Sequence, residues 1–237
     1  MVFHVLSIPI HPTRKEITIC AFTQKVYKFC SEMFKRGHTV YHYGHPDSKV
    51  SCTEHISVIC RPTYDDHFKG QKWQDFLPQN IKNKLHEEFN INSAREVLKR
   101  RHGKNDLVLA FWGVGHKDAC EKLKDGMIVV EPSIGYDSFF AHFRVFESYA
   151  HLHKMLGGAG QNHPCPTDHV IPPGFTPDDF EFSDKKEDYW LFLGRIVDAK
   201  GVHIADQLSR ALRQPIKFVG PQTLKNTLPK DNPYAEY

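Results

Sequence analysis

The sequence has little of what marks membrane and secreted proteins. It contains no uninterrupted run of about 18 apolar residues, so we expect no membrane span. Residues 2–8 already look like a strand, at a place where a secretory signal peptide would show a charged region followed by an apolar one. We therefore expect a cytoplasmic protein.

Cysteine spacing offers no framework for a metal site or a set of disulfides. The 237 residues include six cysteines but no C-x-x-C pair, and zinc sites and disulfide scaffolds need tighter spacing. The 16 histidines show no metal-ligand spacing either. We predict free, mostly buried thiols and no metal. The cysteines are Cys20, Cys30, Cys52, Cys60, Cys120 and Cys165.

An excess of charge of one sign is also missing. The 31 basic and 28 acidic residues leave a net charge of +3, which is too balanced to indicate nucleic-acid binding by itself. A local basic cluster occupies residues 99–104. Because cations stabilise the C-terminal end of a helix, we interpret this cluster as a solvated helix end. Acceptor or nucleic-acid binding there is the alternative.

What the sequence does contain is an alternation of apolar runs and amphipathic segments. Residues 3–8 predict a buried strand, and residues 39–43 predict a second one. Between them, apolar residues recur at helical spacing over 22–33, and Gly37 provides the helix stop. Strand, helix, strand is the opening unit of a doubly wound sheet. With 40% hydrophobic residues, the pattern predicts an α/β fold class with a Rossmann-type parallel sheet.

The same patterning places the other elements of the first 170 residues. Further strands are expected at 55–59, 106–111 and 127–130. Helices are expected over 81–98 and 139–156, the second ended by Gly157 and Gly158. Its aromatic residues favour core packing over an acceptor groove. Loops are expected at 65–79, which contains Trp73 and Phe76, and at 161–168.

A strand, a turn and a helix that suit a diphosphate begin near residue 189. The apolar run 190–193 stops at Gly194 and is followed by Arg195, Lys200 and Gly201, and then by a helix marked by apolar residues 205, 208 and 212. Arginine offers a rigid fork of donors, and lysine offers a compact charge. The N-terminus of the following helix adds unpaired N–H groups and a positive dipole end. A solvated pair of loop cations is the alternative.

The run G-R-x4-K-G after an apolar strand, preceded by V-I-P-P-G-F at 170–175, resembles the retaining nucleotide-sugar glycosyltransferases of family four. That resemblance implies the two-domain GT-B fold. It implies that Arg195 and Lys200 grip the donor diphosphate and stabilise it as it leaves, without metal or other cofactor. Gly194, Gly201 and Gly220 are the accompanying donor-site glycines. Pro173 stands where the family usually has Asn.

The chain departs from the family in its first half. The family's loop after the first strand usually carries a glycine pair, whereas residues 8–19 contain none, so any contact there falls to side chains such as Thr13 and Arg14. Family members often have a histidine just after the strand that ends here at residue 130. This chain has Glu131, Ser133, Gly135 and Tyr136 in that region instead.

Two strand ends therefore provide candidates for sugar or acceptor contacts. Ligands of open α/β sheets bind outside the carboxyl ends of the strands. His116 follows the strand at 106–111, although it could simply start a helix over 117–123. Glu131 and Tyr136 follow the strand at 127–130, with Ser133 and Gly135 between them. We expect these residues, with Thr13 and Arg14, to contact the sugar or the acceptor.

The expected organisation is an N-terminal Rossmann-like, acceptor-side domain over 1–172, a linker over 173–188, and the beginning of a donor domain over 189–237. The last part holds one strand–helix–strand unit, with its second strand at 216–220, and then a tail. The family's E-x7-E motif does not follow Gly220. We expect the second Rossmann-like domain to be incomplete, with its remainder in a longer chain or supplied by a second one.

These observations favour a retaining glycosyltransferase that uses a nucleoside diphosphate sugar and a hydroxyl acceptor. The acceptor class stays open between a glycan, a lipid-linked sugar, a protein and a modified nucleobase. The alternatives are a non-catalytic nucleotide-sugar-binding module and one half of a split enzyme. A nucleotide-cofactor oxidoreductase is disfavoured because G-x-G-x-x-G is absent from residues 7–15.

Overall fold

The computed structural model describes residues 1–70, 80–175, 177–220 and 231–236. The chain divides into two compact units, Met1–Gly174 and Phe175–Tyr237. Trp73 and Phe76, which the sequence places in a loop, lie outside the described residues. Among the helices of the described ranges, none is long and apolar enough to cross a membrane.

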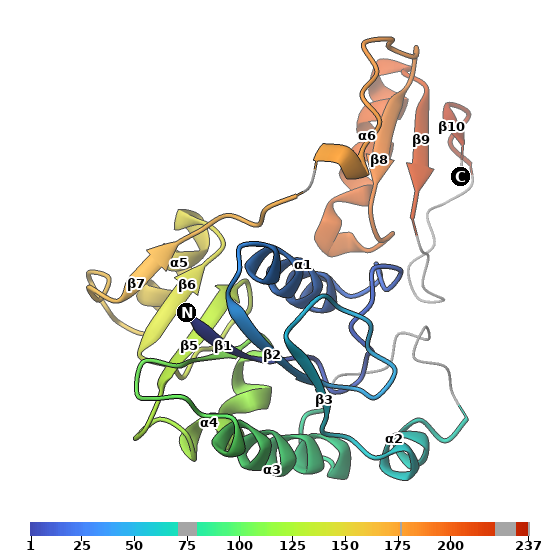
Figure 1. The fold of residues 1–237 in the computed structure, drawn as a ribbon. Helices are drawn as coiled ribbons and strands as arrows, with labels where there is room; N and C mark the ends of the chain where they lie inside the picture. The colour runs from blue at the N-terminus through green and yellow to red at the C-terminus, as the bar shows by residue number, and fades with distance from the viewer. Residues whose placement is uncertain (71–79, 176, 221–230, 237) are drawn as a thin grey trace. The chain divides into compact units, whose positions relative to one another are not determined.

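In the described part of the first unit, seven parallel strands form one sheet (Figure 1). Their order across the sheet is β3-β2-β1-β4-β5-β6-β7, so the direction of winding reverses between β1 and β4. The predicted α/β class with a doubly wound, Rossmann-type sheet is confirmed. The strands are β1 (Val2–Leu6), β2 (Thr39–Gly44), β3 (Glu54–Ser57), β4 (Leu107–Ala110), β5 (Ile128–Ile134), β6 (Phe143–Phe146) and β7 (Asp168–Val170).

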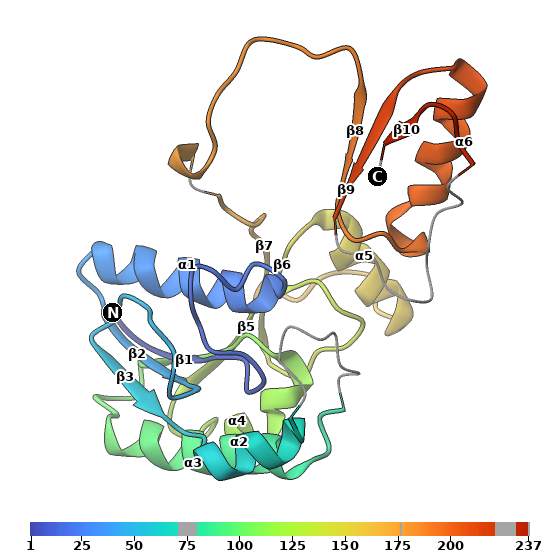
Figure 2. The same cartoon turned by 90° about the vertical axis from the view of Figure 1, so that its right-hand side faces the viewer.

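Helices cover both faces of this sheet. Figure 2 shows α1 on one face and α2, α3 and α4 on the other. Strands β1 and β4 pair from Phe3 opposite Leu107 to Leu6 opposite Ala110. Their side chains Val5, Leu6 and Val108 are fully buried, as expected of central strands that are covered on both faces. The helical segments are α1 (Ala21–Lys35), α2 (Arg61–Phe68), α3 (Lys84–Lys99), η1 (Gly113–His116), α4 (Lys117–Glu121) and α5 (Tyr149–Gly158).

Local chemistry fixes where the main helices begin and end. Asn83 caps α3 by accepting a hydrogen bond from the backbone N–H of His86 at 3.0 Å, and Ser148 caps α5 in the same way from His151 at 3.1 Å. After α1, Gly37 takes a φ of 79°, a left-handed conformation that glycine adopts without strain. The predicted helix stop at Gly37 is therefore in place.

The predicted helix over 139–156 is wrong in its first half. Residues 143–146 form β6, which pairs with β5 and β7, and α5 begins only at Tyr149. The buried guanidinium of Arg144 explains the strand, because it makes a two-pronged ion pair with Asp168 of β7 at 2.5 and 2.7 Å. The expected loop at 161–168 accordingly ends in a strand.

Two other boundaries differ from the sequence prediction. The first part of the expected loop at 65–79 belongs to α2, whose second residue is a proline and whose Tyr64 and Phe68 bury one helical face. Strand β5 runs on to Ile134, so Glu131 and Ser133 lie within the strand and not after it. The pairing of β5 with β6 shifts register between Glu131 and Ile134, which is how the strand continues through this segment.

In the described part of the second unit, three parallel strands form a sheet in the order β10-β9-β8. The sequence predicts two of these strands and the helix between them, but not β10, which is two residues long. One face is covered by α6, with Ile196, Val202, Ile216 and Phe218 buried in between. The elements are η2 (Pro177–Asp179), β8 (Trp190–Leu193), η3 (Asp198–Lys200), α6 (Val202–Leu212), β9 (Ile216–Val219) and β10 (Ala235–Glu236).

The six cysteines are free thiols, and all lie in the described ranges. Only Cys30 and Cys120 are fully buried, whereas Cys60 is exposed and the other three are half-buried. The expectation of mostly buried thiols is thus wrong for most of them. Among the described residues, no group of three or more His, Cys, Asp or Glu side chains is arranged to hold a metal ion.

Candidate functional site

The turn between β8 and α6 carries the proposed diphosphate ligands. Gly194 follows β8 directly, and Arg195 and Lys200 are both exposed. The short helix η3 ends at Lys200, and Gly201 then takes a φ of 72° and begins α6. The N-cap of α6 is Gly201, which has no side chain to cap the helix. The turn thus presents two cationic side chains next to a helix N-terminus, a combination suited to an anion.

A second glycine holds this turn close to the end of β9. The backbone N–H of Gly194 donates to the carbonyl oxygen of Val219 at 2.9 Å. A Cβ atom on Gly220 would lie only 1.8 Å from the carbonyl oxygen of Gly194, so no other residue fits there without moving the backbone. The three predicted donor-site glycines therefore shape a single turn region in the second unit.

The turn also contains one acidic residue, which reduces its net positive charge. Asp198 lies between Arg195 and Lys200 in the sequence, begins η3 and is exposed. The turn therefore carries one acidic residue together with its two cations. The arrangement is therefore suited to an anion that gains directional hydrogen bonds from Arg195, and it does not rest on net charge alone.

In the first unit, the carboxyl ends of β1, β4 and β5 deliver the other candidate residues. Strands β1 and β4 are neighbours at the point where the winding of the sheet reverses, which is where open α/β sheets bind ligands. The segments that leave these ends contain Thr13 and Arg14 after β1, His116 after β4, and Tyr136 after β5. These segments form the candidate sheet edge of the first unit.

His116 is fully buried at this edge, and both of its ring nitrogens are engaged. Its Nδ1 accepts the backbone N–H of Trp112 at 3.2 Å, so Nε2 carries the proton and donates to the carbonyl oxygen of Ser7 at 2.9 Å. The ring stacks on Phe89 with the centroids 5.1 Å apart. Burial lowers the pKa of His116 to about 3, so the imidazole is neutral. The side chain joins the end of β1 to the turn after β4.

Glu131 is also fully buried, and three donors surround its carboxylate. One oxygen accepts the hydroxyl of Tyr136 at 2.9 Å, and the other accepts the backbone N–H groups of Phe140 at 2.8 Å and Ala141 at 3.0 Å. Burial raises the pKa of Glu131, although the three hydrogen bonds oppose that shift. The carboxylate holds the segment after β5 against the strand.

The ring of Tyr136 packs closely against Gly113, in the turn after β4. A Cβ atom on Gly113 would come within 2.6 Å of the Tyr136 ring, and Gly113 has a φ of 54°. The ring also lies 5.9 Å from that of Phe22, which in turn packs edge-on against Trp112 at 5.1 Å. Burial, and secondarily the Glu131 carboxylate, raise the pKa of the Tyr136 hydroxyl. A cluster of half-buried aromatic rings therefore lies at this edge.

Ser133 and Gly135 flank an ion pair that sequence reasoning missed. Ser133 takes a left-handed φ of 55°, and Nζ of Lys25 lies 3.5 Å from its carbonyl oxygen. The ammonium group of Lys25 also contacts a carboxylate oxygen of Glu147. A Cβ atom on Gly135 would lie 2.7 Å from the other Glu147 oxygen. Because Lys25 and Glu147 are 122 residues apart, no local pattern could have joined them.

Thr13 and Arg14 are held by β2, by the loop that follows β2 and by α1. The buried Thr13 hydroxyl lies 2.9 Å from Nε2 of His42, and Nε of Arg14 donates to the carbonyl oxygen of Asp47 at 2.5 Å. The amide of Gln24 donates to three backbone carbonyls of the same segment, at residues 14, 15 and 17. His116, Glu131, Ser133, Gly135 and Tyr136 thus share the ends of β4 and β5, whereas Thr13 and Arg14 lie with the loop beside β2.

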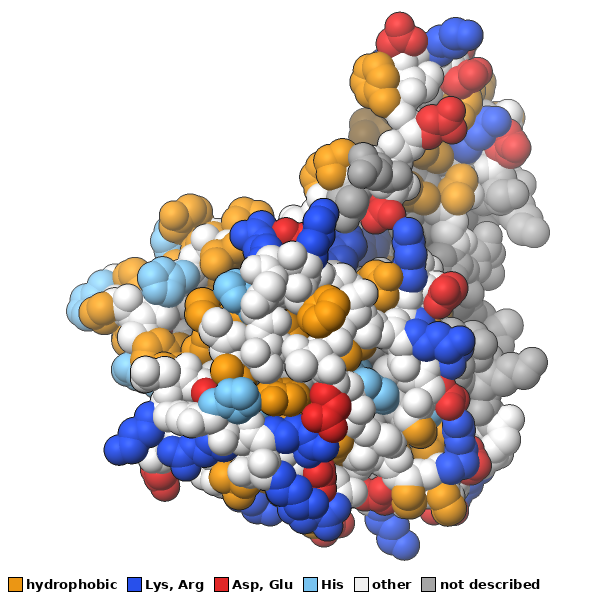
Figure 3. Space-filling model, viewed as in Figure 1, with side chains coloured by type: hydrophobic (Ala, Val, Ile, Leu, Met, Phe, Trp, Pro, Cys, Tyr) orange, Lys and Arg blue, Asp and Glu red, His pale blue; other side chains and the backbone are white. Residues whose placement is uncertain are grey.

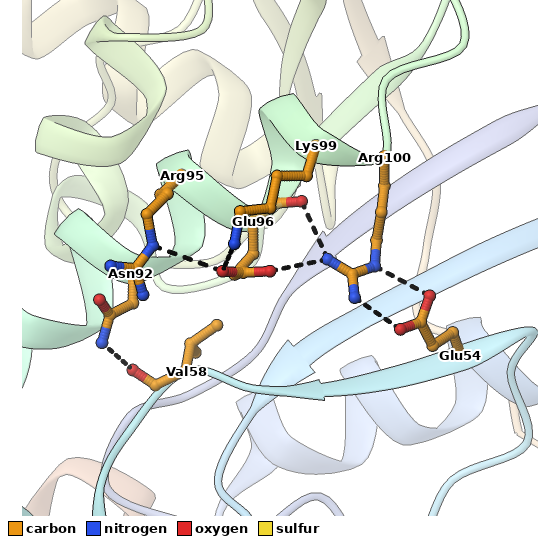
Figure 4. Close-up of polar contacts among 7 residues, drawn as sticks. All are labelled: Glu54, Val58, Asn92, Arg95, Glu96, Lys99 and Arg100. Carbon is orange, nitrogen blue, oxygen red and sulfur yellow. Dashed lines mark hydrogen bonds and ion pairs between the residues drawn. The ribbon is translucent and has the colours of Figure 1, made fainter.

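Two cations of the basic cluster at 99–104, Lys99 and Arg100, form ion pairs with acidic neighbours, as Figure 4 shows. Glu96 accepts Nζ of Lys99 at 2.7 Å and NH1 of Arg100 at 2.8 Å, and Glu54 accepts Arg100 at 2.6 and 2.8 Å. Hydrogen bonds from Lys99 and Arg100 lower the pKa of Glu96 to about 2. Figure 3 shows basic and acidic side chains interspersed over the lower part of the first unit. This pairing favours the helix-end interpretation.

No family model matches the sequence, and no curated protein matches it. Among solved structures, the chain is similar to the crystal structure of AviGT4, a glycosyltransferase involved in avilamycin A biosynthesis. The TM-score is 0.48 and the identity is 14% over 94% of this chain. The match takes in 57% of the AviGT4 chain, so this chain spans less than two thirds of that protein's length. A similarity of this size does not by itself assign a fold or an activity.

Proposed function

We propose that the protein takes part in the transfer of a sugar from a nucleoside diphosphate donor to a hydroxyl acceptor, with retention of configuration. The observation that carries the proposal is the turn between β8 and α6, where the exposed Arg195 and Lys200 precede the helix and its N-cap, Gly201, makes no side-chain capping hydrogen bond. The resemblance of this G-R-x4-K-G run to family-four glycosyltransferases points in the same direction.

The proposed chemistry is electrostatic. Negative charge grows on the β-phosphate as the glycosidic bond breaks, and donors already in place lower the barrier to that step. Arg195 would bind two phosphate oxygens through its planar fork, and Lys200 would add a compact charge. The first N–H groups of α6 would take a further oxygen. No metal and no other cofactor enters this proposal.

In this proposal, the first unit binds the acceptor. Tyr136, Ser133 and Gly135 would contact the sugar or the acceptor at the carboxyl ends of β4 and β5. Glu131 and His116 would act as positioning residues, because their polar atoms are committed to Tyr136 and to backbone groups. Thr13 and Arg14 would contribute from the loop after β1.

A non-catalytic nucleotide-sugar-binding module, or one half of a split enzyme, is a second candidate. Leu191, Leu193 and Val219 are all exposed, the second of them to 74%. Since Phe192 and Phe218 pack toward α6, alternation places these three side chains on the opposite face of the sheet. Parallel sheets are normally covered on both faces, so a second chain or a further segment would fit here.

The experiment that tests the proposal separates binding from turnover. Titration calorimetry with UDP, GDP, ADP and TDP measures diphosphate binding, and incubation with the corresponding glucose donors measures release of nucleoside diphosphate. Binding together with release is the expected result. Binding without release would favour the non-catalytic module or the split enzyme. Absence of binding to every nucleotide would contradict the proposal.

A further inference from the structure

Two histidines face each other across neighbouring strands at the edge of the first unit's sheet. His42 of β2 lies directly opposite His55 of β3, which is the edge strand of the described sheet (Figure 1). Their Nδ1 atoms are 2.8 Å apart, and their ring centroids are 5.0 Å apart. Because each neutral imidazole carries one hydrogen, one Nδ1 atom donates to the other. His42 is fully buried and His55 is half-buried, so this hydrogen bond lies at the boundary between the core and solvent.

The other ring nitrogen of His42 holds the segment that follows β1. Its Nε2 atom lies 2.9 Å from the hydroxyl of Thr13, which is fully buried. The backbone of Thr13 is fastened as well, since its N–H donates to Oγ of Ser48 at 3.0 Å and its carbonyl oxygen accepts the N–H of Lys49 at 2.8 Å. A Cβ atom on Gly44 would lie 2.8 Å from Cε1 of His42, so the ring is also enclosed on that side. His42 thus links the edge strand to the segment after β1.

The surroundings of this pair do not favour a positive charge. Within the described ranges, neither ring forms a hydrogen bond with a carboxylate. Burial, and secondarily the neighbouring His55, lower the pKa of His42 to about 3. Burial also lowers the pKa of His55, although the backbone groups of His42 and His45 oppose that shift. The charged groups around His45, the next histidine along, are Asp47, Arg61 and Arg14.

Protonation of both rings is incompatible with this contact. If both imidazoles are charged, both Nδ1 atoms carry hydrogen, so two donors face each other where a hydrogen bond needs one acceptor. The two like charges also repel each other. A charged His42 regains solvation only if water reaches its ring, whose two nitrogens are covered by His55 and by the hydroxyl of Thr13. Protons on the pair therefore favour a state in which these covers have moved away.

We propose that His42 and His55 form an acid-sensitive latch, which on taking up protons releases the segment around Thr13 and Arg14 from β2 while the central strands stay folded. This inference rests on the proposed function for its biological meaning, since the segment would then withdraw from the acceptor side, but not for its test. At neutral pH the latch is closed and holds Thr13 in place. The competing explanation is a structural pair that opens only when the whole sheet unfolds.

The latch predicts a steep dependence of local opening on pH. Below pH ~6.5, the ordinary pKa of histidine, the open segment binds more protons than the closed one. Each proton taken up on opening raises the open population by up to about tenfold per pH unit, so the two histidines together raise it by up to about a hundredfold. His11 is buried in the same segment with its pKa lowered to about 4, so it adds to this increase. The share of the pair is the part that substitution of His42 or His55 removes.

Amide hydrogen exchange of the whole chain, followed residue by residue with NMR at pH 6.5, 6.0 and 5.5, measures the open population. The amides of Thr13 and Lys49 report the latch, because both donate hydrogen bonds that its opening breaks. The amides of β1 and β4, at the centre of the sheet, report global unfolding. We expect opening at Thr13 and Lys49 to rise steeply with acid while β1 and β4 stay protected.

His55→Gln and His42→Gln should each reduce the rise at Thr13 and Lys49 by up to about tenfold per pH unit, because each removes one titrating ring. The matched control is His153→Gln on α5, an exposed histidine whose substitution should leave the rise unchanged. Near-ultraviolet circular dichroism checks that each variant is folded. His55→Gln, at a half-buried position, carries the test if His42→Gln does not fold.

Two results would overturn the inference. One is exchange at Thr13 and Lys49 with the same pH dependence as in β1 and β4, and the other is a folded His55→Gln variant that keeps the full rise. Neither result bears on the proposed function, because the measurement contains no sugar or nucleotide and Arg195 and Lys200 belong to the other unit. Absence of nucleoside diphosphate binding would conversely contradict the proposed function and leave the latch in place.

Discussion

Nε2 of His116 lies 2.9 Å from the carbonyl oxygen of Ser7, so a side chain that follows β4 closes the end of β1. The same ring accepts the backbone N–H of Trp112 through Nδ1. Two segments that are distant in the sequence are therefore fastened by one neutral imidazole. The candidate sheet edge depends on this histidine for its shape.

His116→Ala should lower the free energy of unfolding by about 2–4 kcal/mol, because it leaves a cavity and two backbone groups without their partner. Urea unfolding followed by Trp fluorescence measures the change. The control is His153→Ala on α5, where the side chain is exposed and the expected change is within about 0.5 kcal/mol. Equal stability of the two variants would contradict the assigned positioning role.

Buried histidines should make the fold sensitive to mild acid. Burial lowers the pKa of His42 and His116 to about 3, and that of His45 and His86 to about 4, from an ordinary value near 6.5. The unfolded chain therefore binds more protons than the folded one between these values. Each histidine contributes stability that is complete above pH ~6.5 and is lost by about 1.4 kcal/mol per pH unit below it, until its folded pKa is reached.

Urea midpoints at pH 7.5, 6.5, 5.5 and 4.5 measure this dependence. We expect little change between the first two values and a steep fall across the last two. His42→Gln should flatten the fall, because it removes one of the contributing groups. A midpoint that stays constant or rises from pH 6.5 to pH 4.5 would show that the histidines are protonated in the folded state.

Arg195→Ala and Lys200→Ala should each weaken nucleoside diphosphate binding by roughly 10- to 150-fold. This range corresponds to a charge-assisted hydrogen bond of about 1.5–3 kcal/mol. Lys186→Ala is a matched control, since Lys186 is an exposed cation of the same unit outside the turn. Calorimetric titration with the nucleotide that binds best gives the three affinities. Equal losses in all three variants would point to general charge attraction instead of a built site.

Tyr136→Phe and Glu131→Ala should differ clearly in their effect on stability. Tyr136→Phe removes one of the three donors to Glu131 and should cost about 0.5–1.5 kcal/mol. Glu131→Ala strands the N–H groups of Phe140 and Ala141 and leaves a cavity, so we expect about 3 kcal/mol or more. Thermal and urea unfolding compare the two variants. A larger loss for Tyr136→Phe would mean that the hydroxyl, and not the carboxylate, organises this segment.

The sequence predicted the first unit well where its elements are set by local pattern. The apolar runs before residues 8, 44 and 111 became β1, β2 and β4. The prediction failed at β6, because the apolar pattern of residues 143–146 fits both the helical and the strand period. The partner that decides the strand is Asp168 of β7, which pairs with Arg144 and lies 24 residues further along the chain. The prediction also missed β10, which is too short to carry any pattern.

The candidate site was also predictable only in part, because its contacts join residues that are far apart in the sequence. Single positions at strand ends, such as His116 and Tyr136, follow from the α/β pattern. Their partners do not, because hydrogen bonds such as that from Lys25 to Glu147 join α1 to the end of β6. The sequence also could not reveal that the ring nitrogens of His116 are used up by backbone groups. The roles of Arg195 and Lys200 stay predictions.

Because Gly194 and Gly220 lie in close contact, the geometry of the turn after β8 depends on Gly220 having no side chain. Any side chain on Gly220 would collide with the carbonyl oxygen of Gly194 and displace the backbone that presents Arg195. In a scan of all single substitutions, Gly220 should therefore tolerate as little change as the cations themselves. A residue without a side chain therefore constrains the backbone that precedes Arg195.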